Sequence, residues 1–124
     1  MTDWTTDELD KIGEADELDI TVRRADGTSR KPVTIWVVRD GDALYIRSGY
    51  GDRAAWYRAA LRSREGEISA GGVRKAVRFD DADPAVHGRI DADYRSKYVR
   101  HGAQWVNPMI APEARPTTIK LVPL

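Results

Sequence analysis

Residues 18–48 read LDITVRRADGTSRKPVTIWVVRDGDALYIRS, and this stretch decides the fold. Apolar and polar residues alternate over residues 18–23, which predicts a strand with one buried and one polar face. Residues 32–38 are apolar on both faces and predict a central strand, with a proline at its start where a missing donor does least harm. The alternation returns over residues 44–48. Because an Asp-Gly turn separates each strand from the next, we expect the three to form an antiparallel meander.

A helix and a second hairpin are predicted after the meander. Residues 53–64 place apolar side chains four positions apart, and Asp52 suits the N-cap of this helix. Residues 67–70 predict a short strand. A Gly-Gly turn comes next, and residues 73–79 alternate as a fifth strand.

Both ends of the chain add further elements. The motif Thr5-Thr6-Asp7-Glu8 is a capping box, so residues 1–16 are expected to form a helical arm. Residues 83–98 predict a helix that begins with an aspartate followed by proline. Residues 100–116 contain three prolines and a glycine and are expected to pack as an irregular flap. Residues 117–122 predict a closing strand.

The predicted elements describe one α+β domain, mainly β, that spans residues 1–124. The domain has six strands, mainly antiparallel, and two or three helices. A small twisted sheet with so few strands buries its apolar face best by curling into a barrel.

The composition excludes several kinds of protein. The chain has no cysteine, so it holds no disulfide, no thiolate nucleophile and no cysteine-based zinc site. It has no apolar run near the ~18 residues that a membrane span needs. Its N-terminus is acidic, unlike a signal peptide, which predicts a cytoplasmic protein. A net charge of +0 argues against nucleic-acid binding.

The charges are unevenly placed along the chain. Residues 1–20 carry eight acids and one base, whereas residues 21–78 carry thirteen bases and six acids. Either the basic section meets an anionic ligand or the acidic arm folds over it. The densest local cluster of bases comprises Arg23, Arg24, Arg30 and Lys31.

Parts of the sequence resemble a known group of proteins. The hairpin at residues 26–32 is similar to one in the split β-barrel flavin-binding proteins, which have the pyridoxamine-phosphate-oxidase-like fold. Residues 48–52, leading into residues 55–58, resemble the strand-to-helix junction of their deazaflavin-dependent nitroreductase branch. This likeness covers about residues 18–80. Over nearly its full length, the chain looks even more like a small uncharacterised family, a domain of unknown function.

The resemblance implies a six-stranded split barrel, often dimeric, with FMN or a deazaflavin in a groove. Carried over by position, the residues near the phosphate and the polar atoms of the ring are Arg30, Lys31 and Ser48, and those lining the groove are Trp56, Tyr57 and Arg58.

The residues themselves leave a second interpretation open at several of these places. The Gly-rich turn at residues 48–52 could present free N–H groups to a phosphate, or it could be an ordinary capped turn. Trp36, Trp56 and Trp105 could stack on a planar ring, or they could be core or dimer-interface residues.

One helix face places Asp83, His87 and Asp91 four positions apart, a spacing at which carboxylates and imidazole can bind a metal. No fourth ligand is evident, so the sequence predicts no metal site. No Ser-His-Asp or Cys-His arrangement stands out either. We therefore assign no catalytic acid, base or nucleophile from the sequence.

Two hypotheses of function fit these observations. The first is an oxidoreductase-type domain that binds a flavin-like cofactor, in which the cofactor carries the redox chemistry. The second is a non-catalytic barrel that binds a small anion or a protein partner. Spare aromatic surface at Trp36, Tyr45 and Trp105 also predicts a homodimer.

The basic hairpin and the strand-to-helix junction are predicted to face the same groove. Ser48 ends the third strand, and Arg30 and Lys31 lie at the start of the central strand. If those two strands pair antiparallel, the end of one lies beside the start of the other. Cations and free N–H groups would then converge on one anion.

Overall fold

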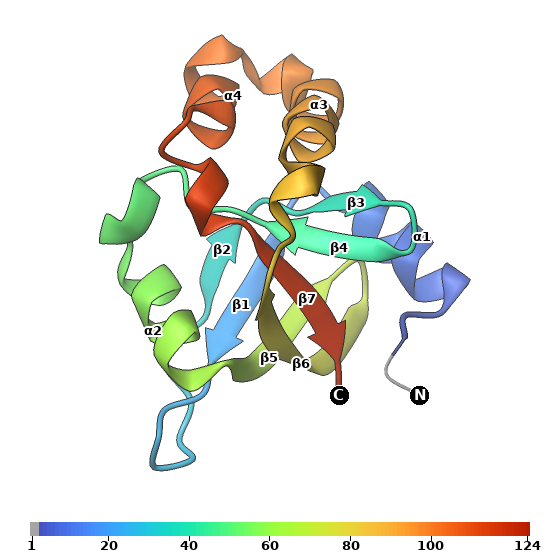
Figure 1. The fold of residues 1–124 in the computed structure, drawn as a ribbon. Helices are drawn as coiled ribbons and strands as arrows, with labels where there is room; N and C mark the ends of the chain where they lie inside the picture. Colours follow the sequence, from blue (N-terminus) through green and yellow to red (C-terminus); the bar gives the residue numbers. More distant parts are fainter. Residues whose placement is uncertain (1–2) are drawn as a thin grey trace.

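The computed structural model describes residues 3–124, and within them seven strands form one antiparallel sheet that curls into a half-barrel (Figure 1). In order across the sheet the strands are β2 (Val33–Ile35), β1 (Leu18–Val22), β5 (Glu65–Ala70), β6 (Val73–Asp81), β7 (Ile119–Pro123), β4 (Ala43–Ile46) and β3 (Val38–Asp40). This confirms the predicted mainly β, antiparallel class, with seven strands in place of six.

Within residues 3–124, four α-helices cover the half-barrel: α1 (Thr6–Glu14), α2 (Ala55–Ser63), α3 (His87–Tyr98) and α4 (Ala103–Ile110). Helix α2 packs against β1, while α3 and α4 pack against each other above β3 and β4 (Figure 1). None of the helices within the described range has the length and apolar character needed to cross a membrane.

Strand β4 lies between two hydrophobic clusters and is buried on both faces. Leu44 and Ile46 point into the main core, which also takes in α1, α2 and the inner face of the sheet. Tyr45 points the other way, into a smaller cluster beneath α3 and α4. The apolar stripe of α3, with Ile90 and Tyr94 fully buried, supplies much of that smaller cluster.

The central strand predicted over residues 32–38 is wrong. The run breaks at Trp36-Val37, so that β2 pairs with β1 while β3 pairs with β4, at opposite edges of the sheet. The break has a visible cause, because side chains of α3 occupy the backbone groups of Val37. Its N–H donates to the Tyr98 hydroxyl at 3.2 Å, and its carbonyl accepts from Lys97 Nζ at 2.7 Å. Each Asp-Gly turn does form a hairpin, but the two hairpins are separate.

The predicted capping box is present at the start of α1. Thr5 Oγ1 accepts from the Glu8 N–H, and Glu8 Oε1 accepts from the Thr5 N–H. Trp4, just before the cap, is buried and donates from Nε1 to the Leu121 carbonyl at 3.0 Å. The arm is thereby fixed to β7.

The cap predicted for α2 is corrected. Asp52 lies in a short 3₁₀ turn, Gly51–Arg53, and Ala54 occupies the N-cap of α2 without a side-chain hydrogen bond. A second turn before the helix moves Asp52 away from the first N–H groups. Arg64 ends the helix in the left-handed conformation, with φ at 64°.

The flap predicted as irregular over residues 100–116 contains helix α4, with Pro108 inside it. A proline here removes one helical hydrogen bond. Val106 and Met109 are buried against the smaller cluster, and this packing outweighs the lost bond.

Candidate functional site

A basic hollow of about 290 Å³ opens between the β1–β2 hairpin and the first turn of α2. Arg24, Arg30 and Lys31 supply its charge. Val22 and Val33 supply apolar walls, and Trp56 closes it on the side of α2. Three cations beside an apolar wall suit an anionic group that is joined to a less polar body.

The acidic N-terminal arm does not neutralise this hollow. Its carboxylates pair with other bases: Glu8 with Lys75 at 2.8 Å, Asp10 with Arg39 at 2.6 Å, and Asp16 with Arg100 and His101. No carboxylate of residues 3–124 forms an ion pair with Arg30 or Lys31. The arm thus folds over basic residues, but it leaves the hairpin cations available.

An aromatic groove of about 470 Å³ adjoins the basic hollow. Its aromatic side chains are Trp36, Tyr50, Trp56 and Trp105. Tyr50 is 75% exposed and Trp105 is 58% exposed, which is unusual for side chains of this size. Trp56 borders both spaces, so the groove and the basic hollow meet at one indole ring.

Trp36 is held in place at the groove wall. Its ring stacks on Tyr98 with the centroids 3.9 Å apart and the planes 1° from parallel. Tyr98 is fixed in turn because its hydroxyl donates to the Asp16 carbonyl at 2.7 Å. A wall aromatic that is already packed on one side can take part in binding at little cost in side-chain entropy.

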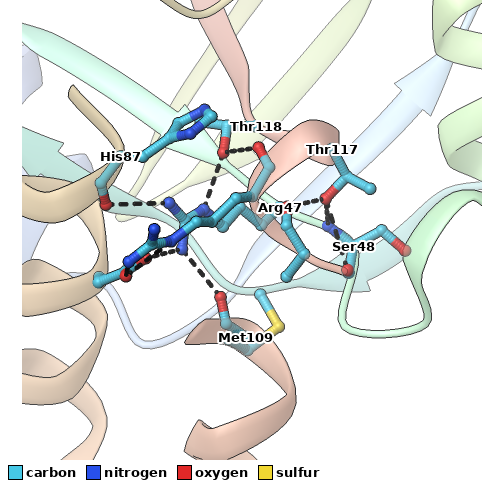
Figure 2. A network of polar contacts seen from close by, with 9 residues as sticks. Arg47, Ser48, His87, Met109, Thr117 and Thr118 are labelled. Carbon is cyan, nitrogen blue, oxygen red and sulfur yellow. Dashed lines mark hydrogen bonds and ion pairs between the residues drawn. The ribbon is translucent and has the colours of Figure 1, made fainter. Parts of the chain in front are cut away.

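The floor of the groove contains a residue that the sequence pattern did not predict as functional. The side chain of Arg47 is 0% exposed and reaches three parts of the chain, namely α3, α4 and the residue just before β7 (Figure 2). Its Nε donates to Thr118 Oγ1 at 2.8 Å, Nη1 to Asp91 at 2.5 Å and to the Met109 carbonyl at 3.0 Å, and Nη2 to the His87 carbonyl at 3.2 Å. Because Met109 lies near the end of α4, Arg47 fixes the helix that carries Trp105.

Asp91 is the anionic partner of this buried arginine. Its second oxygen accepts from Arg115 Nη2 at 2.5 Å, so two guanidinium groups share one carboxylate. Burial opposes ionisation, but the hydrogen bonds from Arg115 and Arg47 outweigh it and hold the pKa of Asp91 below its ordinary value. Burial, with the nearby Arg47 and Arg115 charges, lowers the pKa of His87. Of the three side chains considered for a metal, Asp91 is therefore bound by two arginines, and Asp83 accepts from the Ala85 N–H at 3.0 Å.

The six site residues carried over from the resemblance fall into three places. Arg30, Lys31 and Trp56 surround the basic hollow. Tyr57 and Arg58 line a loop hollow of about 980 Å³, between residues 49–53 and the segment after α4, which shares Gly49, Tyr50 and Pro108 with the aromatic groove but no residue with the basic hollow. Ser48 is buried, and its N–H donates to Thr117 Oγ1 at 2.9 Å (Figure 2).

Of the predicted junction, only the first turn of α2 reaches the hairpin cations, and neither Ser48 nor the Gly-rich turn after it lines the basic hollow. The strands β2 and β4 lie far apart in the sheet order, so Ser48 is not brought beside Lys31 by a ladder. Instead α2 crosses next to β1 and carries Trp56 to the hairpin. Gly49 and Tyr50, just after Ser48, reach the same tryptophan through the aromatic groove.

A carboxylate on α3 gives a pH-dependent prediction for stability. Burial and the adjacent Asp40 raise the pKa of Asp93 to about 6, and Asp93 Oδ2 has no hydrogen-bond partner among residues 3–124. Arg89 faces the pair and binds Asp40 at 3.0 Å. The folded state therefore binds a proton at Asp93 more tightly than the unfolded chain does. The stabilisation from protonated Asp93 is fully present below pH ~4 and is lost as the pH rises through about 6.

At pH 8, Asp93→Asn removes a buried charge that Asp40 repels, so it should raise the free energy of unfolding. The gain should be about 1 kcal/mol, because the side chain is partly exposed and water screens the repulsion. At pH 4 the gain should vanish. Urea unfolding at both pH values measures the difference. Asp42→Asn, an exposed aspartate of the adjacent β3–β4 turn, is the matched control and should change little. Equal effects of the two substitutions at pH 8 would refute the assignment.

Comparison with protein families places the chain among bacterial proteins. A family model described as "Uncharacterized protein conserved in bacteria (DUF2255)" matches residues 8–121. A search of curated proteins finds no match.

Several solved structures have a similar fold. An F420 reductase is 16% identical with a TM-score of 0.51, covering 93% of this chain and 90% of its own. A putative pyridoxamine 5'-phosphate oxidase from Listeria innocua is 13% identical with a TM-score of 0.59, covering 94% and 88%. An FAD-binding protein from Mesorhizobium loti is 14% identical with a TM-score of 0.55, covering 98% and 89%. At these identities the likeness establishes a shared fold.

Proposed function

The chain belongs to the uncharacterised bacterial family DUF2255, and we propose that it is an oxidoreductase-type domain that binds a phosphate-bearing flavin or deazaflavin. One observation carries this proposal. Trp56 borders both a hollow with three cations and a groove with three further aromatic side chains. A ligand with a planar ring at one end and a phosphate at the other matches that arrangement.

The residues present fit such a cofactor. Arg24, Arg30 and Lys31 would hold the phosphate, because guanidinium and ammonium groups make charge-assisted hydrogen bonds to its oxygens. Trp56 and Trp105 would enclose the ring and exclude water from it. When bound, the flavin or deazaflavin supplies hydride or electron transfer. The chain's own contribution is to bind, orient and shield it.

The remaining residues suggested by the resemblance have supporting roles in this proposal. Ser48 anchors the start of the loop at residues 49–53 through its bond to Thr117. Tyr57 and Arg58 would touch only a part of the ligand, or a substrate, that extends over the loop into the loop hollow.

Fold similarity supports the proposal at the level of ligand class. The F420 reductase and the FAD-binding protein that share the fold are associated by name with deazaflavin or flavin. The fold is therefore compatible with ring-and-phosphate ligands of both kinds.

Titration of the purified protein with FMN and with a reduced deazaflavin tests the function. We expect at least one of them to bind and to change its fluorescence on entering the aromatic groove. Failure of both to bind at submillimolar concentration would contradict the proposal.

A non-catalytic anion-binding role is the second candidate, and the unpaired cations of the basic hollow favour it. In that case the protein would bind inorganic phosphate at Arg30 and Lys31 but would not bind riboflavin, which has the ring without the phosphate. Riboflavin binding thus distinguishes the two functions.

A homodimer is also proposed, through the face that carries Tyr50 and Trp105. The predicted interface residue Tyr45 is only 6% exposed, because β4 is covered on both faces, and Trp36 is stacked on Tyr98. Trp105 at the groove rim is the residue left to mediate contact, and a second copy would shield it from water.

Trp105→Arg should shift the protein from dimer to monomer, since a charge replaces the apolar rim. Light scattering coupled to gel filtration at high micromolar concentration measures the mass. Val99→Arg adds the same charge at an exposed apolar residue that does not line the aromatic groove, and this control should stay dimeric. A monomeric wild-type protein would contradict the dimer.

A further inference from the structure

A second hollow lies directly behind the basic hollow, between the hairpin loop and the C-terminal half of α2. This arginine hollow has a volume of about 300 Å³. Its charged lining residues are Arg23, Arg24, Arg30 and Arg62. Arg24 and Arg30 line both hollows, so the two spaces adjoin across these side chains.

The sequence of α2 explains why the space is open. Ala59 and Ser63 lie one helical turn apart on the side that faces the hairpin, and their short side chains leave room above the helix. Arg62 lies beside Ser63 at the edge of the same space. Its long side chain can reach an anion there without displacing any packed group.

The charge of the two hollows together is compensated only in part. The described residues that line them include five bases, namely Arg23, Arg24, Arg30, Lys31 and Arg62, and no acid. Among residues 3–124, Arg23 is the only one of these bases with an ion pair, to Glu65 at 3.5 Å on the exposed surface. Hydrogen bonds from Thr28 and the charge of Arg24 lower the pKa of the nearby Asp26. Arg24 donates from Nη1 to the Ser29 carbonyl at 3.0 Å and keeps further N–H donors.

Five like charges around adjoining spaces repel one another unless anions lie between them. One phosphate in the basic hollow would contact the cations on one side and leave Arg62, which has no ion pair among residues 3–124, without a partner. We infer that the arginine hollow is a second anion subsite, so that the ligand carries two linked anionic groups, as in a diphosphate. The two anionic groups are inferred from the hollows themselves. Only the claim that they are joined to a planar ring rests on the proposed function.

Calorimetric titration of the full chain with inorganic pyrophosphate and with orthophosphate tests the second subsite without any ring. We expect pyrophosphate to bind about tenfold more tightly than orthophosphate, since a second phosphate gains its own charge-assisted hydrogen bonds. Arg62→Ala should reduce the ratio to near one while leaving orthophosphate affinity unchanged. Arg95→Ala removes the same charge from the exposed surface of α3 and should preserve the ratio.

Comparison of FMN with FAD, which has a diphosphate, extends the test to the complete ligand. Wild-type protein should prefer FAD, and Arg62→Ala should lose that preference while still binding FMN. If flavins bind without a diphosphate preference, the second subsite is wrong and the proposed function stands. If pyrophosphate is preferred through Arg62 but neither a flavin nor a deazaflavin binds, the subsite stands and the proposed function is wrong. A similar loss of orthophosphate affinity in Arg62→Ala would show a merely structural role for Arg62 and overturn the inference.

Discussion

Replacing Arg47 by methionine should lower the free energy of unfolding by about 3 kcal/mol. Removal of one partner from a buried ion pair leaves the other charge in a poorly solvated place, and such changes cost about 3–5 kcal/mol. Asp91 keeps one contact with Arg115, which places the expected loss at the lower end of that range. The carbonyls of His87 and Met109 would also lose their donor. Chemical denaturation of the purified variant measures the loss.

Two further variants separate the buried pair from the surface contact. Arg115→Met removes the arginine whose side chain is 48% exposed, and it should cost less than about 1 kcal/mol. The double variant Arg47→Met/Asp91→Leu should be more stable than Arg47→Met, because no unpaired carboxylate then remains buried. Equal losses of unfolding free energy in Arg47→Met and Arg115→Met would show that the burial of Arg47 does not set its contribution to stability.

Replacing Trp56 by alanine should weaken binding of FMN and of riboflavin alike, by about tenfold to a hundredfold. Stacking of a heteroaromatic ring on an aromatic side chain contributes roughly 1–3 kcal/mol. Trp56 borders both the basic hollow and the aromatic groove, and its loss would also remove the wall that these two spaces share. Fluorescence titration of both ligands measures the effect.

Trp56→Phe is the matched control, because it keeps an aromatic surface in the same position. It should retain most of the affinity, and far-UV circular dichroism should show that both variants keep α2. Unchanged riboflavin affinity in Trp56→Ala would exclude this tryptophan from the ring site.

Local patterns predicted the hairpins and the class of the fold, but not the order of the strands. Each Asp-Gly pair marks a turn, because glycine adopts positive φ, at 88° in Gly27 and 62° in Gly41. The break at Val37 was not predictable from its neighbours. It depends on Tyr98 and Lys97, which lie sixty residues away in the sequence and take up its backbone groups.

The alternation over residues 44–48 predicted that Arg47 lies on a solvated face, and this was wrong for a related reason. A strand with one solvated face would expose both Tyr45 and Arg47, which share a side of the pleat. Both are buried because α3 and α4 cover that side. The four-residue spacing of Ile90, Tyr94 and Tyr98 was the available signal, since an apolar helix stripe requires an apolar surface to pack against.

The parts of the candidate site that could be predicted are those whose charged residues are neighbours in the sequence. Arg30 and Lys31 are adjacent in sequence, and a strong basic hairpin is visible without a structure. The role of Trp56 as the shared wall of two hollows depends on how α2 crosses β1. No spacing rule within the chain indicates that crossing.

The most direct test of this account is a titration of FMN and riboflavin against the wild-type protein and the variant Arg30→Ala/Lys31→Ala. We propose that the phosphate lies at these two cations and the ring in the aromatic groove. The variant should therefore lose affinity for FMN by about a hundredfold while its weaker affinity for riboflavin stays the same. Equal FMN affinity in the two proteins would contradict the site, and a wild-type protein that binds neither a flavin nor a deazaflavin would contradict the function.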